Sequence, residues 1–265
     1  MINKESILFK IFLIFVGIIL IFPIGRSQVN DSTFRYHYET VKMDSTFDNP
    51  VDLTMDTYIE TNRSKMGKEL EIVIGESASE LPRYKPQSPL SNFLVDQLFI
   101  YASQYLQINN SNDSIDIALL NLGGIRASMN AGKIKVENIY QIAPFDNYFV
   151  LVYIKGSELK KMYKKFTEKD MGILANSQMV FQNGRIISYS IQGKPIQDDK
   201  TYVMATIDFL SNGGDGYLEN IKVEKVDYTG ILIRDIYIQQ IQKITASGKK
   251  VESKMDQRVI IKPTP

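Results

Sequence analysis

The sequence predicts a mixed α/β fold: one compact domain of mixed sheets covered by helices, preceded by a helical lead-in. Apolar residues recur at helical spacing in some segments, whereas other segments are continuous apolar runs or alternate with period two. The two kinds of segment are interleaved without strict alternation, which favours a mixed α/β class. The chain has 265 residues, 44% of them hydrophobic, which is enough apolar material for a core.

The N-terminus has the layout of an export signal. Lys4 and Lys10 precede an uncharged apolar run over residues 11–22, and the small residue Ser27 follows. We therefore predict a signal peptide over residues 1–27. A retained short membrane anchor is the alternative, although a spanning helix needs roughly 20 apolar residues. Either interpretation predicts a folded part in the bacterial periplasm or otherwise outside the cytoplasm.

Charge and cysteine content exclude several classes of function. The formal net charge is +1 and the basic residues are scattered, so nucleic acid is not expected as a partner. The absence of cysteine excludes disulfides, a thiol nucleophile and a cysteine-ligated zinc. The one histidine, His37, lies in a polar segment, which favours a surface or strand position over a catalytic role.

The lead-in, residues 28–66, differs in pattern from the domain proper, residues 67–265. Residues 28–50 are polar and rich in turn formers, and their one candidate element is an edge strand around residues 34–38. Residues 51–66 contain apolar positions and no helix breaker, which predicts a linker helix.

The domain proper opens with a predicted strand over residues 70–74, ended by Gly75, and then with its clearest helix. Ser88 is a natural N-cap, and Pro89 suits the first helical position. Apolar residues then follow at helical spacing through Tyr105, which predicts an amphipathic helix.

Strand and helix patterns follow one another through the middle of the domain. Residues 115–120 form a nearly unbroken apolar run, which indicates a strand buried on both faces. A short helix over residues 136–142, a strand over residues 148–154 and an amphipathic helix opened by Gly156 are predicted next. Four lysines mark the outer face of that helix and are predicted to be merely solvated: Lys160, Lys161, Lys164 and Lys165.

The C-terminal third is predicted to begin with strands. Residues 179–207 alternate in polarity around the hairpin dipeptide Asn183-Gly184. Residues 231–244 predict a last amphipathic helix, and a short strand is expected at residues 258–263. The glycine-rich stretch TIDFLSNGGDGY, residues 206–217, is interpreted as a hairpin turn.

Generic ligand motifs do not decide the function. Neither the P-loop pattern nor G-x-G-x-x-G occurs, and the glycine pairs in NLGGIR and SNGGDG are unspecific by themselves. SNGGDG also lacks the alternating acidic ligands of a calcium-binding loop.

Several longer motifs are informative because they occur together and in order. The sequence contains NLGGIR, GKIKVEN, PFDN, IKGSEL and DFLSNGGDGY between residues 121 and 217. In this arrangement residues 50–260 closely resemble the C-terminal domain of the periplasmic and ecto-5'-nucleotidase family. The resemblance implies that fold and a nucleotide or nucleoside ligand, most naturally a purine one.

The resemblance also implies roles for individual residues in substrate binding. Phe145 and Phe209 would hold the base between their rings, a contact worth roughly 1–3 kcal/mol per base. Asn121 and Asn147 would hydrogen-bond the base edge, and Asp215 would accept hydrogen bonds from the ribose hydroxyls.

The resemblance assigns the phosphate-binding residues less completely than the residues that would bind the base and the ribose. Arg126 would bind the phosphate, for which a planar guanidinium is well suited. The family carries a second phosphate arginine, but ungapped alignment places Tyr84 there, between Arg83 and Lys85. That second role stays unassigned.

Catalysis is expected to come from elsewhere. Family members normally carry a calcineurin-like metallophosphatase domain, whose two divalent metals are held by Asp, Asn and His motifs. None of those motifs occurs here, so no metal ligand, cofactor or catalytic residue is assigned in this chain. The leading hypothesis is the substrate-specificity half of a hydrolase of nucleotide catabolism, acting with a separate metallophosphatase. The alternatives are an extracytoplasmic nucleoside-binding protein and a structural remnant.

Overall fold

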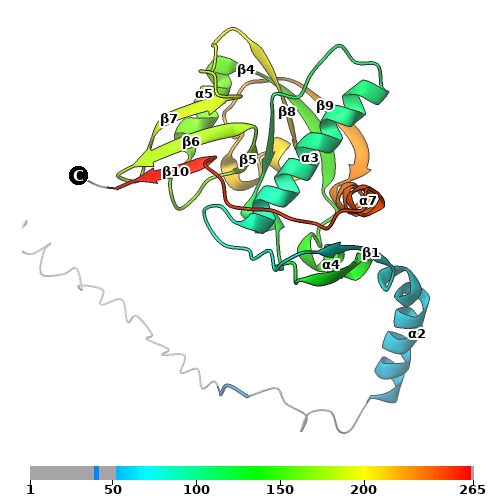
Figure 1. Cartoon of the computed structure of the whole chain (residues 1–265). Helices are drawn as coiled ribbons and strands as arrows, with labels where there is room; N and C mark the ends of the chain where they lie inside the picture. The colour runs from blue at the N-terminus through cyan, green and yellow to red at the C-terminus, as the bar shows by residue number, and fades with distance from the viewer. Residues whose placement is uncertain (1–38, 42–51, 264–265) are drawn as a thin grey trace, which may run out of the picture. The chain divides into compact units, whose positions relative to one another are not determined.

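A computed structural model describes residues 39–41 and 52–263 (Figure 1). The chain divides into two units, Met1–Leu53 and Thr54–Pro265. In the first unit residues 39–41 are exposed and form no regular structure. The predicted signal peptide and the candidate strand at residues 34–38 lie outside the described residues. Among the helices that are described, none has the length and apolar character needed to cross a membrane.

A five-stranded mixed sheet forms the centre of the second unit, which confirms the mixed α/β class. Its strands, in spatial order, are β5 (Ile173–Ala175), β2 (Ile117–Leu120), β8 (Thr201–Ile207), β4 (Tyr148–Lys155) and β9 (Val223–Leu232). Strands β2 and β8 run parallel, whereas the other neighbours are antiparallel. All four residues of β2 are buried, as the unbroken apolar run predicts.

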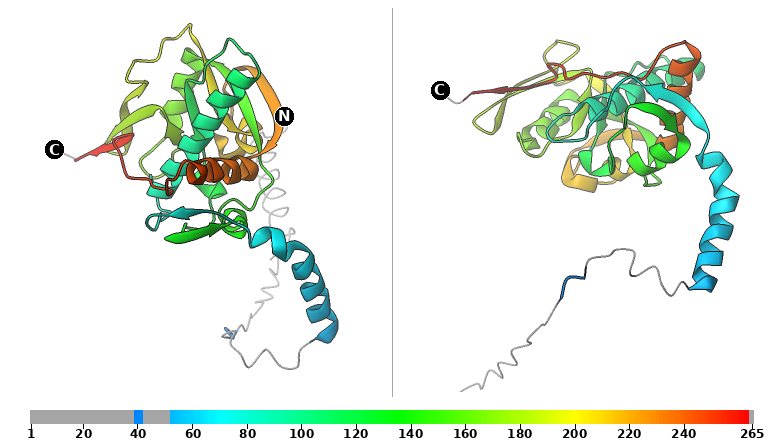
Figure 2. Two further views of the ribbon diagram at one scale, coloured as in Figure 1. Left: turned by 45° about the vertical axis from the view of Figure 1, so that its right-hand side comes forward. Right: turned by 60° about the horizontal axis from the view of Figure 1, so that its bottom comes forward.

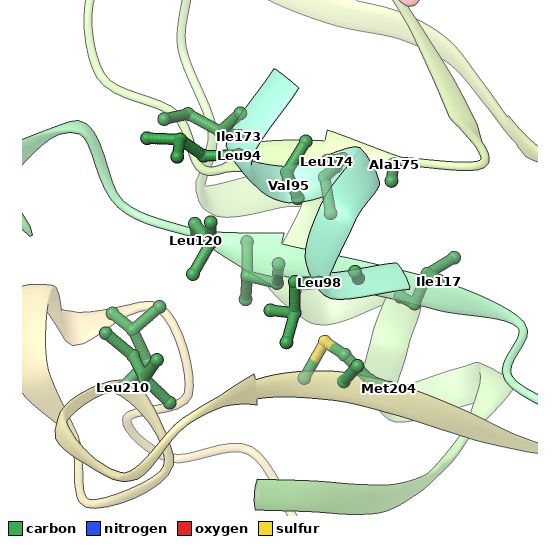
Figure 3. Packing of buried hydrophobic residues seen from close by; sticks show 14 of the residues in the cluster. Leu94, Val95, Leu98, Ile117, Leu120, Ile173, Leu174, Ala175, Met204 and Leu210 are labelled. Atoms are coloured by element: carbon green, nitrogen blue, oxygen red, sulfur yellow. The ribbon is translucent and has the colours of Figure 1, made fainter. Parts of the chain in front are cut away.

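The helix α3 (Pro89–Ile108) packs on this sheet and confirms the clearest sequence prediction. Ser88 caps it, accepting a hydrogen bond from the backbone N–H of Ser91. Figure 3 shows Leu94, Val95 and Leu98 of α3 above apolar residues of β2, β5 and β8. The helix α7 (Ile233–Ala246) packs against α3, as Figures 1 and 2 show.

Smaller sheets and helices complete the domain. Strand β1 (Val73–Ser77) pairs with β3 (Gly132–Lys135), and β10 (Val259–Lys262) and β7 (Arg185–Ile191) flank β6 (Ser177–Gln182). The remaining α-helices of the described part are α2 (Leu53–Leu70), α4 (Val136–Ile142), α5 (Gly156–Lys165) and α6 (Asp208–Ser211). Asn183 and Gly184 have φ values of 53° and 75°, which confirms the hairpin between β6 and β7.

The first strand lies further along the chain than predicted. Helix α2 continues to Leu70, so the predicted strand over residues 70–74 is displaced to β1, and Gly75 lies inside that strand. A Cβ atom at Gly75 would stand 2.6 Å from Thr245 Oγ1 and 2.7 Å from Ile241 Cγ2. The glycine is therefore required by the close approach of α7, and it does not end the strand.

The interpretation of residues 206–217 as a hairpin turn is wrong. Strand β8 ends at Ile207 and is followed by α6 and by the 3₁₀ helix η3 (Gly214–Gly216). A hairpin would pair β8 with the next strand, β9, but β4 lies between them in the sheet. Strand β9 was not predicted. The last helix begins at Ile233, two residues later than predicted, and Ile231 belongs to β9.

The lysines of α5 lie on its outer face, where Lys161, Lys164 and Lys165 are exposed, and three of the four also bond to neighbouring residues. Lys160 pairs with Asp198 at 2.6 Å, and Lys161 pairs with Glu158 at 2.7 Å. Lys165 donates a hydrogen bond to the carbonyl oxygen of Gly216 at 2.9 Å. The lysine at the end of α5 thus holds the glycine-rich loop that follows α6.

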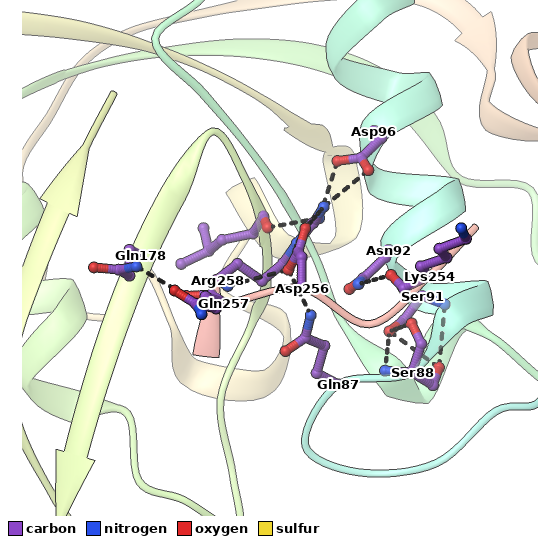
Figure 4. Close-up of polar contacts among 11 residues, drawn as sticks. Gln87, Ser88, Ser91, Asn92, Asp96, Gln178, Lys254, Asp256, Gln257 and Arg258 are labelled. Carbon is purple, nitrogen blue, oxygen red and sulfur yellow. Dashed lines mark hydrogen bonds and ion pairs between the residues drawn. The ribbon is translucent and has the colours of Figure 1, made fainter. Parts of the chain in front are cut away.

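The segment leading to β10 is tied to α3 by a polar network centred on Arg258 (Figure 4). The Arg258 guanidinium donates to both carboxylate oxygens of Asp96 at 2.9 Å and also to Asp256. Burial opposes ionisation of Asp256, but the hydrogen bonds from Arg258 and Gln87 outweigh it and lower the Asp256 pKa. The doubly paired arginine anchors the residue directly before β10, whose own four residues pair with β6.

Candidate functional site

Three chain segments meet at one edge of the five-stranded sheet. Because β2 and β8 run parallel, their carboxyl ends lie at the same edge, so Asn121 follows one strand and Phe209 follows the other. Strand β4 is antiparallel to β8, with Phe149 opposite Ile207, so its amino end lies there too. The loops outside the carboxyl ends of parallel strands are a common location of ligand sites in α/β folds.

A cavity of about 230 Å³ lies between these segments. Its lining residues are Asn121, Gly123, Gly124, Phe145, Asn147, Phe209 and Asp215. Five of the six residues assigned to substrate binding therefore line one cavity, although they are spread over 95 positions of the sequence. The sixth, Arg126, lies beside it, with Cζ 5.9 Å from the centroid of the Phe145 ring.

Asn121 and Asp215 are joined by a hydrogen bond between two walls of the cavity. The Asn121 side-chain amide donates to Asp215 Oδ2 at 2.6 Å, and the Asn121 side chain is buried. Asp215 has a φ of 54°, a left-handed conformation that aspartate tolerates better than most residues. The bond holds an exposed carboxylate in a fixed position at the mouth of the cavity.

Phe209 depends on a glycine beneath its ring. A Cβ atom at Gly214 would stand 2.4 Å from Cε1 of the Phe209 ring and 2.5 Å from two further ring atoms. Non-bonded carbon atoms essentially never approach so closely, so a side chain at Gly214 must shift the ring or the turn beneath it. The ring itself is 45% exposed, because its other side is open to the cavity and solvent.

We predict that Gly214→Ala weakens adenosine binding by about 5-fold or more, because a displaced Phe209 ring cannot stack and one stacked base contributes roughly 1–3 kcal/mol. Calorimetric titration of the variant with adenosine measures the loss. Gly67→Ala is the matched control, since a Cβ atom there meets nothing within 4 Å. Unchanged affinity in Gly214→Ala would contradict the placement of Phe209 in the binding site.

The Asp208 carboxylate connects the chain segments that carry Phe145 and Phe209 by binding backbone N–H groups. Its Oδ1 atom accepts hydrogen bonds from the N–H of Phe209 at 2.8 Å and from the N–H of Tyr148 at 2.9 Å. Tyr148 begins β4, directly after the PFDN corner that carries Phe145. One carboxylate therefore ties the segment after β8 to the segment before β4.

The comparisons with known proteins decide the family. The model of the 5'-nucleotidase C-terminal domain matches residues 70–221. The chain belongs to the 5'-nucleotidase C-terminal domain family. The resemblance drawn from the sequence motifs is thereby confirmed.

Relatives of this 5'-nucleotidase C-terminal domain are longer proteins. UshA of Yersinia enterocolitica is 34% identical over 133 residues, which cover 48% of this chain and 24% of that protein. UshA of Escherichia coli is 30% identical over 190 residues, which cover 68% of this chain and 33% of that protein. The chain thus spans about a quarter to a third of the length of these curated relatives.

Among solved structures, the 5'-nucleotidase precursor from Thermus thermophilus has the same fold. It superposes with a TM-score of 0.66 at 21% identity, covering 81% of this chain and 44% of the other. At this identity the likeness concerns the fold, and the binding roles of individual residues stay predictions.

A second cavity, of about 290 Å³, adjoins the first and shares Gly123 and Asp215 with it. Arg83, Lys85 and Lys169 line it, together with the carboxylate of Asp170. Arg83 donates to the carbonyl oxygen of Leu122 and Lys85 to that of Lys169, so both bond to neutral acceptors. Arg83 and Lys85 flank Tyr84 in the sequence, where the family motifs give them no role, and no motif includes Lys169.

One residue that lines this second cavity, Tyr217, has a shifted pKa. Tyr217 is buried, and its burial raises its pKa far above the usual range, with Asp170 and Asp215 adding to the effect. Within the described residues, no three side chains of His, Asp or Glu form a group that could hold a metal ion.

Proposed function

We propose that this domain recognises a nucleotide or nucleoside outside the cytoplasm and supplies substrate specificity for hydrolysis in nucleotide catabolism. The observation that carries the proposal is the convergence of five predicted binding residues on one cavity. Phe145 and Phe209 are both about half exposed, 47% and 45%, and they line the same space. Large aromatic side chains that stay exposed in this way are suited to stacking on a flat base.

The polar groups of the cavity match a ribose. The Asp215 carboxylate is exposed and oriented by Asn121, so it can accept hydrogen bonds from two vicinal hydroxyls. Asn147 lines the cavity next to Phe145 and is free to bond a base edge through its amide. A purine nucleoside therefore fits both the apolar and the polar parts of the site.

The phosphate end of a nucleotide would meet cations on either side of Gly123. Arg126 donates to the carbonyl oxygen of Gly123 at 3.3 Å, and Arg83 lies in the adjoining cavity. We predict that Arg126→Gln and Arg83→Gln each weaken AMP binding by about 1–3 kcal/mol, the usual worth of a charge-assisted hydrogen bond, and leave adenosine binding unchanged. Titrations with both ligands measure the difference, and an equal loss for AMP and adenosine would contradict the assignment.

The hydrolytic centre is proposed to reside in a separate metallophosphatase that binds two divalent metals. The supporting observations are the family match to the C-terminal domain and a sequence with none of the metal-ligand motifs. A two-metal site activates the attacking water and neutralises the transferred phosphoryl group, and it requires that ligand set.

Activity assays test this division of labour. The purified chain with Mn²⁺ or Zn²⁺ is expected to bind adenosine and to release no phosphate from AMP. Addition of a metallophosphatase encoded beside its gene is expected to give hydrolysis with a higher kcat/KM than that enzyme shows alone. Hydrolysis of AMP by the chain alone would refute the proposal. Adenosine binding without any effect on the metallophosphatase would favour a nucleoside-binding protein, and no binding at all would favour a structural remnant.

A further inference from the structure

We propose that Arg234, in the first turn of α7, is a positioning residue of the nucleoside site. It holds the backbone of the PFDN corner so that Phe145 is in place before the base arrives. The inference rests on the proposed function and assigns a role to a residue outside the family motifs quoted above. It concerns how one wall of the site is built, since Arg234 does not line the cavity itself.

The contacts of Arg234 converge on the corner. Its side chain is only 8% exposed. Nη1 donates to the carbonyl oxygen of Phe145 at 2.9 Å and to that of Ala143 at 3.4 Å, and Nη2 donates to the carboxylate of Asp146. One guanidinium thus binds three acceptors of the corner, the carbonyl oxygens of Ala143 and Phe145 and the side-chain carboxylate of Asp146.

An arginine suits this place because of where the corner lies. Helix α4 ends at Ile142, so the carbonyl groups that follow it have no partner within the helix. A planar guanidinium carries five donors in a fixed arrangement and can serve several of these acceptors at once, which an ammonium group cannot do in the same geometry. The guanidinium also lies over the Tyr140 ring, with Cζ 4.6 Å from its centroid.

The same turn of α7 holds the next cavity residue. The backbone N–H of Ile233 donates to the carbonyl oxygen of Asn147 at 2.9 Å. Helix α7 is in turn packed against α3, α4 and β1. Both Phe145 and Asn147 are therefore anchored through their backbone to a helix that belongs to the core.

Backbone anchoring matters here because much of the Phe145 side chain is open to solvent. The ring is 47% exposed, so packing alone does not hold it. Ordering a mobile side chain during binding costs free energy, whereas a wall fixed in advance avoids that cost. Loss of the Arg234 contacts should accordingly weaken binding while the cavity residues themselves stay intact.

The first test is adenosine binding to Arg234→Met, which keeps the length and apolar stem of the side chain and removes its donors. We expect a loss of about 5-fold or more, bounded by the loss in Phe145→Ala, and partial recovery in Arg234→Lys. In a Phe145→Ala background the further effect of Arg234→Met should be close to none, because Arg234 acts through Phe145. Independent, additive losses would overturn the proposal.

Arg258→Met is the matched control. Arg258 is likewise a mostly buried arginine that donates to carboxylates and to a backbone carbonyl, but it lies in the network of Figure 4 and lines neither cavity of the site. It is expected to lower the Tm and to leave the Kd for adenosine unchanged. If Arg234→Met behaves in the same way, Arg234 is structural only and the proposal fails.

A ligand-free readout separates this proposal from the proposed function. The chain contains no tryptophan, so Phe145→Trp introduces a single tryptophan at the corner, whose emission can be excited selectively over that of the tyrosines. Its emission anisotropy should fall and its quenching by acrylamide should rise when Arg234→Met is added, with the far-ultraviolet circular dichroism unchanged. Unaltered anisotropy would refute the positioning role. Failure of the wild type to bind adenosine would refute the proposed function and leave this measurement valid.

Discussion

Phe145→Ala and Phe209→Ala are each expected to weaken adenosine binding by about 1–3 kcal/mol, which corresponds to roughly 5- to 150-fold in Kd. Each ring lines the cavity and is about half exposed in the free domain. Truncation of either ring removes one stacking surface, and it removes little buried apolar area. The Tm should therefore change little while the affinity falls, as calorimetric titration and thermal unfolding of the same samples would show.

A half-exposed apolar residue elsewhere provides the control for these variants. Ile187 on β7 is as exposed as the two rings and does not line the cavity, so Ile187→Ala should leave adenosine binding unchanged. Wild-type affinity in both phenylalanine variants would exclude a stacked base from this cavity. The cationic cavity around Arg83 would then be the expected main site of ligand contact.

Phe149→Ala is expected to affect stability instead of binding. The free energy of unfolding should fall by about 3–5 kcal/mol. Phe149 lies only four positions after Phe145, but its side chain is fully buried in β4. Its ring packs edge-on against Tyr101 at 5.9 Å and Tyr105 at 5.6 Å between centroids. Removing it leaves a cavity between β4 and α3 that rigid neighbours cannot close.

Denaturant unfolding of Phe149→Ala measures this loss, with Phe149→Leu as the milder control that keeps most of the volume. The contrast with Phe145→Ala is the decisive comparison, because the chemical change is the same and only the surroundings differ. A stability loss below about 1 kcal/mol for Phe149→Ala would show that the contact between β4 and α3 contributes less than a buried aromatic cluster should.

Much of the fold could be predicted because local patterns and tertiary packing agree. The run at residues 115–120 is apolar throughout since β2 is buried on both faces, and Ser88 and Pro89 start α3 through interactions within one turn. Strand β9 was missed for the opposite reason. Its residues are only partly buried and include several charged side chains, so it shows neither an unbroken apolar run nor a clear alternation.

The motifs predicted the individual residues of the candidate site. They did not predict the contacts that hold these residues in place. Nothing in the sequence indicates that Asn121 bonds Asp215, that Gly214 makes room for the Phe209 ring, or that Arg234 serves the carbonyl of Phe145. The partners in the first and last of these contacts are about 90 positions apart, and each contact exists only after the sheet has formed.

The sequence by itself determined the family, the residue types available for binding and most of the helices and strands, because motifs, caps and periodicity act over a few neighbouring residues. Only the tertiary structure decided that three segments meet at one sheet edge. That meeting follows from strand pairing, with β2 parallel and β4 antiparallel to β8, and pairing depends on contacts between distant residues. For the same reason TIDFLSNGGDGY became a short helix and a strained turn beside a cavity, and not a hairpin.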